Sequence, residues 1–204
     1  GDRLYVADEA GIGIIDFRHP ATPVALGHLW LDPERVMPST GVAVAGNLAY
    51  VAHAAYGLKI VDVADPLNPA LIGAYLPPGG CTGVAVEGGR VYGVNGFGGL
   101  HIVDASDPRH PVGKGTLDTP GYPSAVAAAG GIAWVSDGGG GVQAVDVRDP
   151  VRPTLAASCD TAGYAYHLAL GNSHVYVADG QGGLAILDRA VPSPSKGEGQ
   201  GEIG

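Results

Sequence analysis

The sequence predicts an all-β protein of short strands joined by tight turns. Glycine and proline supply 35 and 16 of its 204 residues, which is about twice their usual combined share. The longest stretch without either residue is only ten residues long, 47–56. A typical globular helix needs about 11–12 residues, and an interior glycine or proline costs it about 1 or 3 kcal/mol. A helical fold is therefore excluded, while a hydrophobic content of 46% provides for a packed core.

An internal repeat predicts how these strands are organised. A segment of the form GLxIVD, or a close variant of it, ends at five aspartates: Asp16, Asp62, Asp104, Asp146 and Asp188. The last four aspartates recur every 42 residues, and a proline stands four residues after each of the five. An aromatic strand pattern precedes every copy, as in RLYVAD and HVYVAD.

Each complete unit contains four apolar runs separated by turn residues. In the third unit these runs are 83–87, 90–95, 99–105 and 112–117, and we name the four strands of a unit A to D in chain order. Four strands in about 40–45 residues are typical of one blade of a β-propeller. Strand A is rich in small residues, as the crowded axis requires, and strands B and C carry larger side chains that can pack between blades. The sequence therefore predicts a β-propeller with about five blades.

The motifs VYVAD, GLxIVD, DPxxP and TPGY together resemble the LVIVD repeat family over about residues 1–188. This resemblance implies a propeller of the kind found in bacterial and archaeal secreted or cell-surface proteins. We therefore expect an extracellular, cell-surface or periplasmic location, although no signal peptide opens this segment. The resemblance names no ligand, because a fold does not define a function.

The repeats extend over residues 1–191, and residues 192–204 are predicted to be a disordered or non-native tail. The expected units lie near 1–40, 41–82, 83–124, 125–166 and 167–191. The first unit lacks strand A and the last lacks strand D, so we expect an incomplete arc of a larger ring, with an odd five-bladed closure as the alternative. The absence of an initiator methionine also indicates a processed chain or a fragment. An open arc leaves apolar blade faces uncovered, and this segment is expected to self-associate through them.

Composition also excludes several classes of function. A net charge of −9 disfavours nucleic acid and anionic membranes as partners. No apolar run approaches the length of a membrane span, about 18 residues. The sequence contains no G-x-S-x-G, H-E-x-x-H or P-loop motif. No catalytic residue, metal or cofactor is therefore predicted.

The repeat separates structural from functional residues, since a residue present in every unit most simply serves the unit. The five aspartates that end GLxIVD are predicted to accept backbone N–H bonds in the turn between strands C and D. In a propeller this edge lies opposite the usual ligand face. The loops between strands D and A and between strands B and C therefore form the candidate face.

A polar residue ends strand B in every unit. His53 and Asn95 depart from the aspartate found in the other units and are the more interesting positions. A lone histidine at such a place is most simply an exposed side chain, and Asp137 and Asp179 precede glycine and are typical of turns. The functional alternative is a ring of polar groups around the channel mouth.

The D–A loops PGGCTG, TPGYPSA and TAGYAYH add large side chains to this face. Tyrosine is common at binding surfaces because it is large and rigid and has a polar tip, although tyrosines after glycine can also pack their own turns. His167 opens the last strand A and is predicted to point near the axis, or else to fill a blade edge. The predicted ligand-binding residues are His53, Asn95, Tyr122, Asp137, Tyr164, Tyr166, His167 and Asp179.

These observations favour a non-enzymatic binding scaffold with a protein or glycan ligand over the loop face. The alternative is a propeller enzyme, similar to a lactonase or a dehydrogenase, with a polar or metal site at the channel mouth.

Overall fold

The computed structural model of the protein describes residues 2–9, 11–32, 34 and 37–190. In this part of the chain, short antiparallel strands form five separate sheets, and each strand pairs with its neighbour in sequence. The first and last sheets have three strands each: β1 (Arg3–Ala7), β2 (Gly11–Asp16) and β3 (Val24–Trp30); β16 (His167–Leu170), β17 (His174–Ala178) and β18 (Leu184–Asp188).

Each of the three sheets between them has four strands. These strands are β4 (Ser39–Ala45), β5 (Leu48–His53), β6 (Gly57–Asp62) and β7 (Ala70–Tyr75); β8 (Gly83–Glu87), β9 (Arg90–Asn95), β10 (Gly99–Asp104) and β11 (Val112–Leu117); β12 (Ala125–Ala129), β13 (Ile132–Ser136), β14 (Val142–Asp146) and β15 (Thr154–Cys159). Two single-turn 3₁₀ helices, η1 (Ala54–Tyr56) and η2 (Gly180–Gly182), lie between strands B and C of their units. No helix among the described residues is long and apolar enough to cross a membrane.

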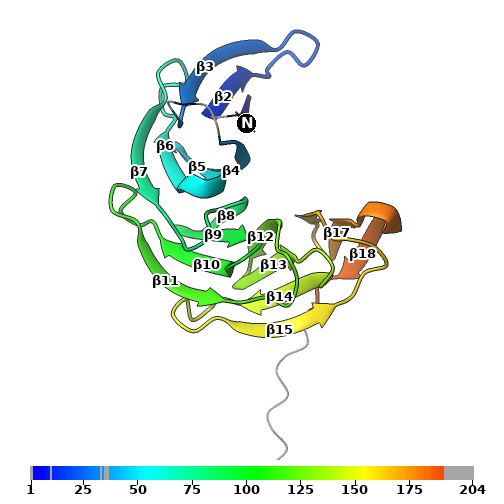
Figure 1. The fold of residues 1–204 in the computed structure, drawn as a ribbon. Helices are drawn as coiled ribbons and strands as arrows, with labels where there is room; N and C mark the ends of the chain where they lie inside the picture. The colour runs from blue at the N-terminus through cyan, green and yellow to red at the C-terminus, as the bar shows by residue number, and fades with distance from the viewer. Residues whose placement is uncertain (1, 10, 33, 35–36, 191–204) are drawn as a thin grey trace, which may run out of the picture.

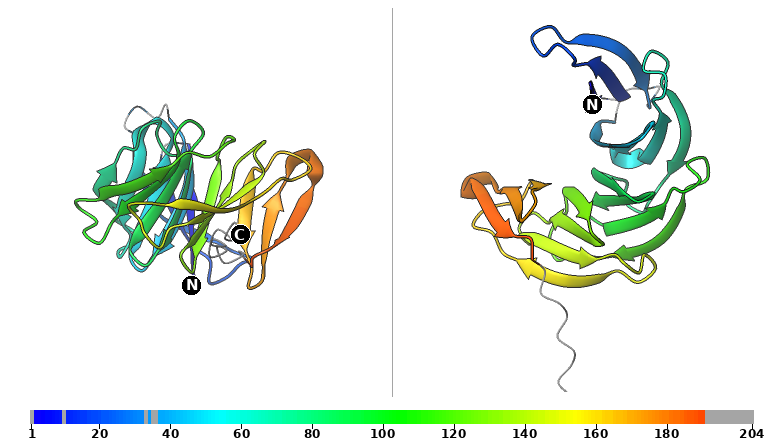
Figure 2. Two further views of the ribbon diagram at one scale, coloured as in Figure 1. Left: turned by 90° about the horizontal axis from the view of Figure 1, so that it is seen from below. Right: turned by 180° about the vertical axis from the view of Figure 1, so that it is seen from behind.

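The sheets stand side by side around a common axis as the blades of an open arc (Figures 1 and 2). Strands β4, β8, β12 and β16 are strands A of successive blades and contact one another near the axis. Strands β3, β7, β11 and β15 are strands D and form the outer rim (Figure 1). The predicted all-β propeller arc is confirmed, and the four strands of the third unit match the prediction to within one residue.

Apolar side chains from facing blades form the core. Tyr50, Leu58 and Ile60 of the second blade, for example, pack against Val91 and Val103 of the third. Equivalent clusters lie at the other three blade–blade contacts. The core therefore consists of four similar layers between sheets.

Glycine in strand D permits close contact with the next blade. A Cβ atom on Gly73 would lie 2.0 Å from the carbonyl oxygen of Pro108, which belongs to the C–D turn of the following blade. Gly27 and Gly115 make the same approach to Pro66 and Pro150. No larger residue fits these positions without moving the backbone.

The predicted role of the five GLxIVD aspartates is confirmed. The Oδ1 atom of each accepts the backbone N–H two residues later, at 2.8 to 3.1 Å. Arg18 adds side-chain hydrogen bonds to Asp16, and these lower the pKa of that carboxyl to about 2. These turns lie at the ends of strands C and so at the edge opposite the candidate face. The tail prediction for residues 192–204 falls outside the described part of the chain.

Candidate ligand-binding face

Asp137 and Asp179 fasten the end of strand B to the loop that enters the same blade. The Oδ1 atom of Asp137 accepts a hydrogen bond from the hydroxyl of Thr119 at 2.6 Å, and its Oδ2 atom accepts one from the backbone N–H of Gly121 at 2.8 Å. Thr161 and Gly163 bind Asp179 in the same way, at 2.5 and 2.8 Å. Both aspartates are buried, so their carboxylates lie beneath the loops of the face.

We call this pair of hydrogen bonds, from a threonine and a glycine of the D–A loop to the aspartate at the end of strand B, the aspartate clasp. Its glycine cannot be replaced by a larger residue without a shift of the backbone. A Cβ atom on Gly121 or Gly163 would lie 1.9 Å from the carbonyl oxygen of the aspartate that binds it. Burial raises the pKa of the Asp137 carboxyl, while the bonds from Thr119 and Gly121 act in the opposite direction. The threonine and the glycine of the recurring sequence Thr-x-Gly-Tyr are thus explained by their hydrogen bonds to the aspartate.

Asn95 makes the equivalent contact in the third blade, but here the side chain at the end of strand B donates hydrogen bonds to the loop instead of accepting them. Its Nδ2 atom donates to the carbonyl oxygens of Pro78 and Gly80 at 3.0 and 3.1 Å, and its Oδ1 atom accepts the N–H of Phe97 at 3.0 Å. The loop before this blade presents carbonyl groups to strand B, so an amide donor replaces the carboxylate. Asn95 also contacts Nε2 of the buried His101, at 3.1 Å.

His53 is fully buried, which corrects the expectation of an exposed side chain. Neither of its ring nitrogens has a hydrogen-bond partner within the described residues. Its ring meets that of Tyr56 edge-on at 5.2 Å between centroids, and burial lowers the pKa of the imidazole. The loop before this blade is organised by Asp32 instead, whose carboxylate accepts the N–H groups of Glu34 and Met37 at 3.0 and 3.1 Å.

Two pairs of exposed aromatic rings lie above these buried groups. Phe97, from a B–C loop, meets Tyr122, from the next D–A loop, edge-on at 5.5 Å between centroids. Their side chains are 86% and 44% exposed. Tyr164 and Tyr166 form the second pair at 4.7 Å, and both are exposed.

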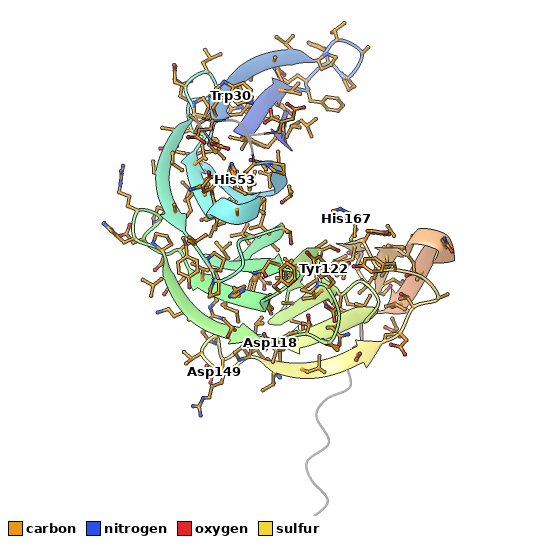
Figure 3. The ribbon with its side chains drawn as sticks, in the orientation of Figure 1. Trp30, His53, Asp118, Tyr122, Asp149 and His167 are labelled. Carbon is orange, nitrogen blue, oxygen red and sulfur yellow. The ribbon has the colours of Figure 1, made fainter. Side chains whose placement is uncertain are left out.

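Glycines in the neighbouring loops leave room for two of these rings to pack against the backbone. A Cβ atom on Gly96 would lie 1.9 Å from Cζ of Tyr122, and one on Gly138 would lie 2.5 Å from Cζ of Tyr164. Each tyrosine therefore rests directly on the backbone of the preceding blade's B–C loop. The structure places Tyr122 toward the inner side of the arc (Figure 3).

Backbone hydrogen bonds join the loops of adjacent blades on this face. The N–H of Cys81 donates to the carbonyl of Ala54 at 2.8 Å. Ala165 and Gly138 exchange two such bonds, at 3.1 and 3.2 Å. The aromatic pairs therefore stand on a connected support and not on independent loops.

His167 lies at the start of β16 and is exposed. Figure 3 places it at the inner end of the last blade, beside the opening of the arc. The structure thus gathers Tyr122, Tyr164, Tyr166 and His167 at accessible positions, whereas it buries the predicted residues at the ends of strands B. Their role in ligand binding stays a prediction.

Phe97 is a candidate that the sequence analysis did not single out. It is the most exposed large hydrophobic side chain among those the structure describes. The sequence does indicate that Phe97 is exposed, because an aromatic residue between Gly96 and Gly98 in a B–C turn has no core to enter.

The two edges of the arc differ in charge. The described residues of the D–A and B–C loops include Glu9, Glu34, Asp118 and Asp160, all exposed, and no lysine or arginine. Most basic residues lie in or beside the A–B and C–D turns at the other edge, where they include Arg18, Arg90, Arg109, Arg148, Arg152 and Arg189. The described part of the loop face is therefore acidic and suits neutral or cationic partners.

Chemical reactivity on this face is limited. Cys81 is buried, and burial raises the pKa of its thiol to about 12, so it is not an activated nucleophile. Among the described residues, no group of three or more His, Cys, Asp or Glu side chains could hold a metal ion. The face offers apolar ring surface and hydrogen-bonding groups for contact with a ligand.

Similarity to solved structures assigns the fold of this chain to the β-propellers. The chain is similar to the computationally designed Ika8 protein (TM-score 0.70, 12% identity), BamB from Moraxella catarrhalis (0.68, 13%) and the Pan2 WD40 domain of Neurospora crassa (0.65, 10%). These matches cover 92%, 92% and 94% of this chain but only 56%, 56% and 60% of theirs. At this identity the likeness is one of fold alone.

The family follows from the sequence itself. The model of the LVIVD repeat matches residues 39–76, 78–119, 120–161 and 162–194. The chain belongs to the LVIVD repeat family. A comparison with curated proteins gives no match.

Proposed function

We propose that this chain is a non-enzymatic binding scaffold of a secreted or cell-surface protein, which holds a protein or glycan partner over its loop face. The observation that carries this proposal is the presence of two exposed aromatic pairs, Phe97–Tyr122 and Tyr164–Tyr166, on one connected set of loops. Membership of the LVIVD family supports the location outside the cytoplasm.

Aromatic pairs suit this role on energetic grounds. A tyrosine or phenylalanine ring removes a large apolar area from water when a partner covers it, and it loses little conformational entropy in doing so. Tyr122 and Tyr164 already pack against the backbone at Gly96 and Gly138, which restricts their rings before a partner binds and lowers the cost of ordering them. The same rings can stack on sugar rings or receive apolar side chains.

The negative charge of the loop face restricts the classes of partner that are compatible with it. Exposed Asp118 and Asp160 lie in the loops that carry the tyrosines. A neutral glycan or a basic segment of a protein is compatible with these carboxylates, whereas a nucleic acid is repelled.

The test uses two probes, an array of neutral glycans and an array of basic peptides. We expect the wild-type chain to bind members of one array, and Tyr122→Ala and Tyr166→Ala each to weaken that binding about tenfold or more, as loss of an interface anchor does. Leu67→Ala is the matched control, since Leu67 is more exposed than either tyrosine but lies in a C–D turn at the opposite edge. Binding to neither array, or binding that both tyrosine variants retain, would contradict the proposal.

A further inference from the structure

We propose that the loop face binds an extended, positively charged segment of a partner protein, along one strip that runs from an apolar pocket beside Leu76 to the ring of Tyr166. This inference rests on the proposed function and goes further in two ways. It adds the pocket to the binding site, and it selects a basic peptide over a neutral glycan as the ligand. The strip is formed by the loops that connect β5 to β16, and neither end of the chain contributes to it.

An open pocket of about 500 Å³ lies where the second and third blades meet on the loop face. Its walls are η1 of the second blade and the D–A loop 76–80. Leu76 in the wall is 64% exposed. Gly80 brings the two walls together, because a Cβ atom there would lie 2.0 Å from the carbonyl oxygen of Ala54. The described lining consists of alanine, leucine, proline and glycine, so the pocket suits an apolar side chain of a partner.

Direct contacts join the pocket to the Phe97–Tyr122 pair. A Cβ atom on Gly98, in the turn that carries Phe97, would lie 3.0 Å from the carbonyl oxygen of Pro78 in the pocket wall. Tyr122 packs on the same turn at Gly96. The pocket and the first aromatic pair are therefore neighbours on one surface.

The strip continues from Tyr122 to the second aromatic pair. The backbone N–H of Tyr122 donates to the carbonyl oxygen of Asp137 at 3.0 Å. The ring of Tyr164 packs on the next residue, Gly138, and its partner in the pair is Tyr166. The pocket and the two aromatic pairs thus form one row of apolar surface across three successive blade junctions.

Exposed carboxylates lie along this row. Asp118 is beside the turn of Phe97, because a Cβ atom on Gly99 would lie 2.8 Å from the Cα atom of Asp118. Asp160 has the same relation to Gly141 of the next blade, at 2.9 Å. The described loops of this face carry no lysine or arginine. Complementary charge therefore favours a cationic ligand.

Lys59 shows how an aromatic ring of this face receives a cation. Its Nζ atom, which comes from strand β6, lies 5.8 Å from the centroid of the Tyr56 ring, and Tyr56 ends η1 in the wall of the pocket. A lysine or arginine of a ligand can make the same cation–π contact with the other exposed rings. Because Lys59 already supplies a positive charge at the pocket end, we expect the apolar residue of the ligand there and its cationic residues over the two aromatic pairs.

The hydrogen-bonding side chains beneath the strip are already used by its own loops. Asn95 donates to the carbonyl oxygens of Pro78 and Gly80, and both carboxylate oxygens of Asp137 accept bonds from the D–A loop. Asn95 and Asp137 are also buried. A glycan needs directional partners for its hydroxyl groups, and it is costly to leave such groups unpaired. A basic peptide needs apolar surface and negative charge, which the strip supplies.

The first experiment measures the binding of synthetic peptides to the wild-type chain by fluorescence anisotropy. Each probe combines one leucine or phenylalanine with several arginines at varied spacing, and each matched peptide carries glutamine at every arginine position. We expect the arginine peptides to bind about tenfold or more tightly than the glutamine peptides, because several charge contacts are lost together. Their binding should weaken as the salt concentration rises.

Two apolar variants then test the path of the strip. Leu76→Ala and Phe97→Ala should each weaken binding of the best arginine peptide about tenfold, as loss of an interface anchor does. Leu67→Ala, at an exposed position in a C–D turn on the opposite edge, should bind like the wild type. All three side chains are exposed, and a thermal melt verifies that each variant is folded.

Two charge variants test the carboxylates. Asp118→Asn and Asp160→Asn should each weaken binding of the same peptide about two- to fivefold, which is the effect of an exposed charge pair, and should reduce its dependence on salt. Asp149→Asn is the matched control, because Asp149 is an exposed carboxylate in a C–D turn at the opposite edge. It should bind the peptide like the wild type.

Failure of this inference is distinguishable from failure of the proposed function. Equal binding of arginine and glutamine peptides, or binding that Leu76→Ala and Phe97→Ala both retain, would overturn the inference. An array of neutral glycans is tested beside the peptides. Binding of glycans without binding of any arginine peptide would refute the basic ligand and leave the proposed scaffold intact, whereas a chain that binds neither probe would contradict both.

Discussion

The carboxylate of Asp137 and the hydroxyl of Thr119 lie 2.6 Å apart, and this bond joins the end of strand β13 to a loop eighteen positions earlier in the chain. The same bond recurs between Asp179 and Thr161. It fixes the D–A loop that carries Tyr122 or Tyr164, so the stability of the clasp and the placement of the aromatic pairs are linked.

Removal of the clasp should destabilise the fourth blade. Asp137→Ala leaves the N–H of Gly121 and the hydroxyl of Thr119 without their acceptor beneath the loops, and we expect a loss of about 2 kcal/mol in the free energy of unfolding. Asp137→Asn keeps one acceptor oxygen and should lose less. Urea denaturation measures both. Equal losses for the two variants would contradict the assignment of the carboxylate as an acceptor for the loop.

Burial of His53 should make stability depend on pH near neutrality. Burial lowers the pKa of His53 below its usual value of 6.5, and burial lowers that of His101 as well. A histidine with a lowered pKa in the folded state favours unfolding once it is protonated. The stability of the wild type should therefore be at its full value above about pH 6.5 and should fall as the pH drops through 6.5 toward the folded-state pKa values.

His53→Gln tests the contribution of this one histidine. The variant should show a shallower loss of unfolding free energy between pH 7 and pH 5 than the wild type, measured by urea denaturation at each pH. His19→Gln is the control, because His19 lies exposed in the C–D turn of the first blade, and it should follow the wild-type profile. A His53→Gln profile parallel to that of the wild type would contradict the burial argument.

The Asp16–Arg18 pair should act in the opposite direction and at lower pH. Hydrogen bonds from Arg18 lower the pKa of Asp16 to about 2 from 3.8. The stability that this carboxylate contributes is therefore present above about pH 4 and is lost as the pH falls toward 2. In thermal melts, Asp16→Asn should melt below the wild type at pH 6, and the difference should shrink at pH 2 to 3. A difference that does not change with pH would show that charge plays no part. The effect should be small, since solvent screens a surface carboxylate.

The sequence predicts those parts of this fold that depend on local pattern. The bond that Asp62 accepts from the N–H of Ala64 spans two residues. Within β9, Val91 lies on one face of the sheet and Tyr92 on the other, as the alternation of side chains along a strand requires. Because the sequence repeats, a strand or turn recognised in one blade can be assigned at the equivalent residues of the other blades. The strand order and the two incomplete end blades were therefore predictable.

Long-range contacts account for what the sequence does not show. His53 is buried with its ring against Tyr56 and its backbone paired with Ser39 of β4, and its position at the end of a strand gives no sign of this. Phe97 is exposed and paired with Tyr122 because two loops from different blades meet. The identity of a ligand is equally absent, because the recurring exposed tyrosines Tyr122 and Tyr164 mark an accessible surface without defining the chemistry of a partner.

The close contact at Gly73 gives a final prediction about blade packing. A Cβ atom there would lie 2.0 Å from the carbonyl oxygen of Pro108, so Gly73→Ala must push the C–D turn of the third blade away from the rim of the second. Overpacking of this kind costs about 1–3 kcal/mol. Gly139→Ala is the matched control, because a Cβ atom on Gly139 meets nothing within 4 Å and its backbone conformation is accessible to alanine. Urea denaturation should show a clear loss for Gly73→Ala and little change for Gly139→Ala. If Gly73→Ala were as stable as the control, strand D would not be held against the following turn, and the glycine would reflect the twist of the strand instead.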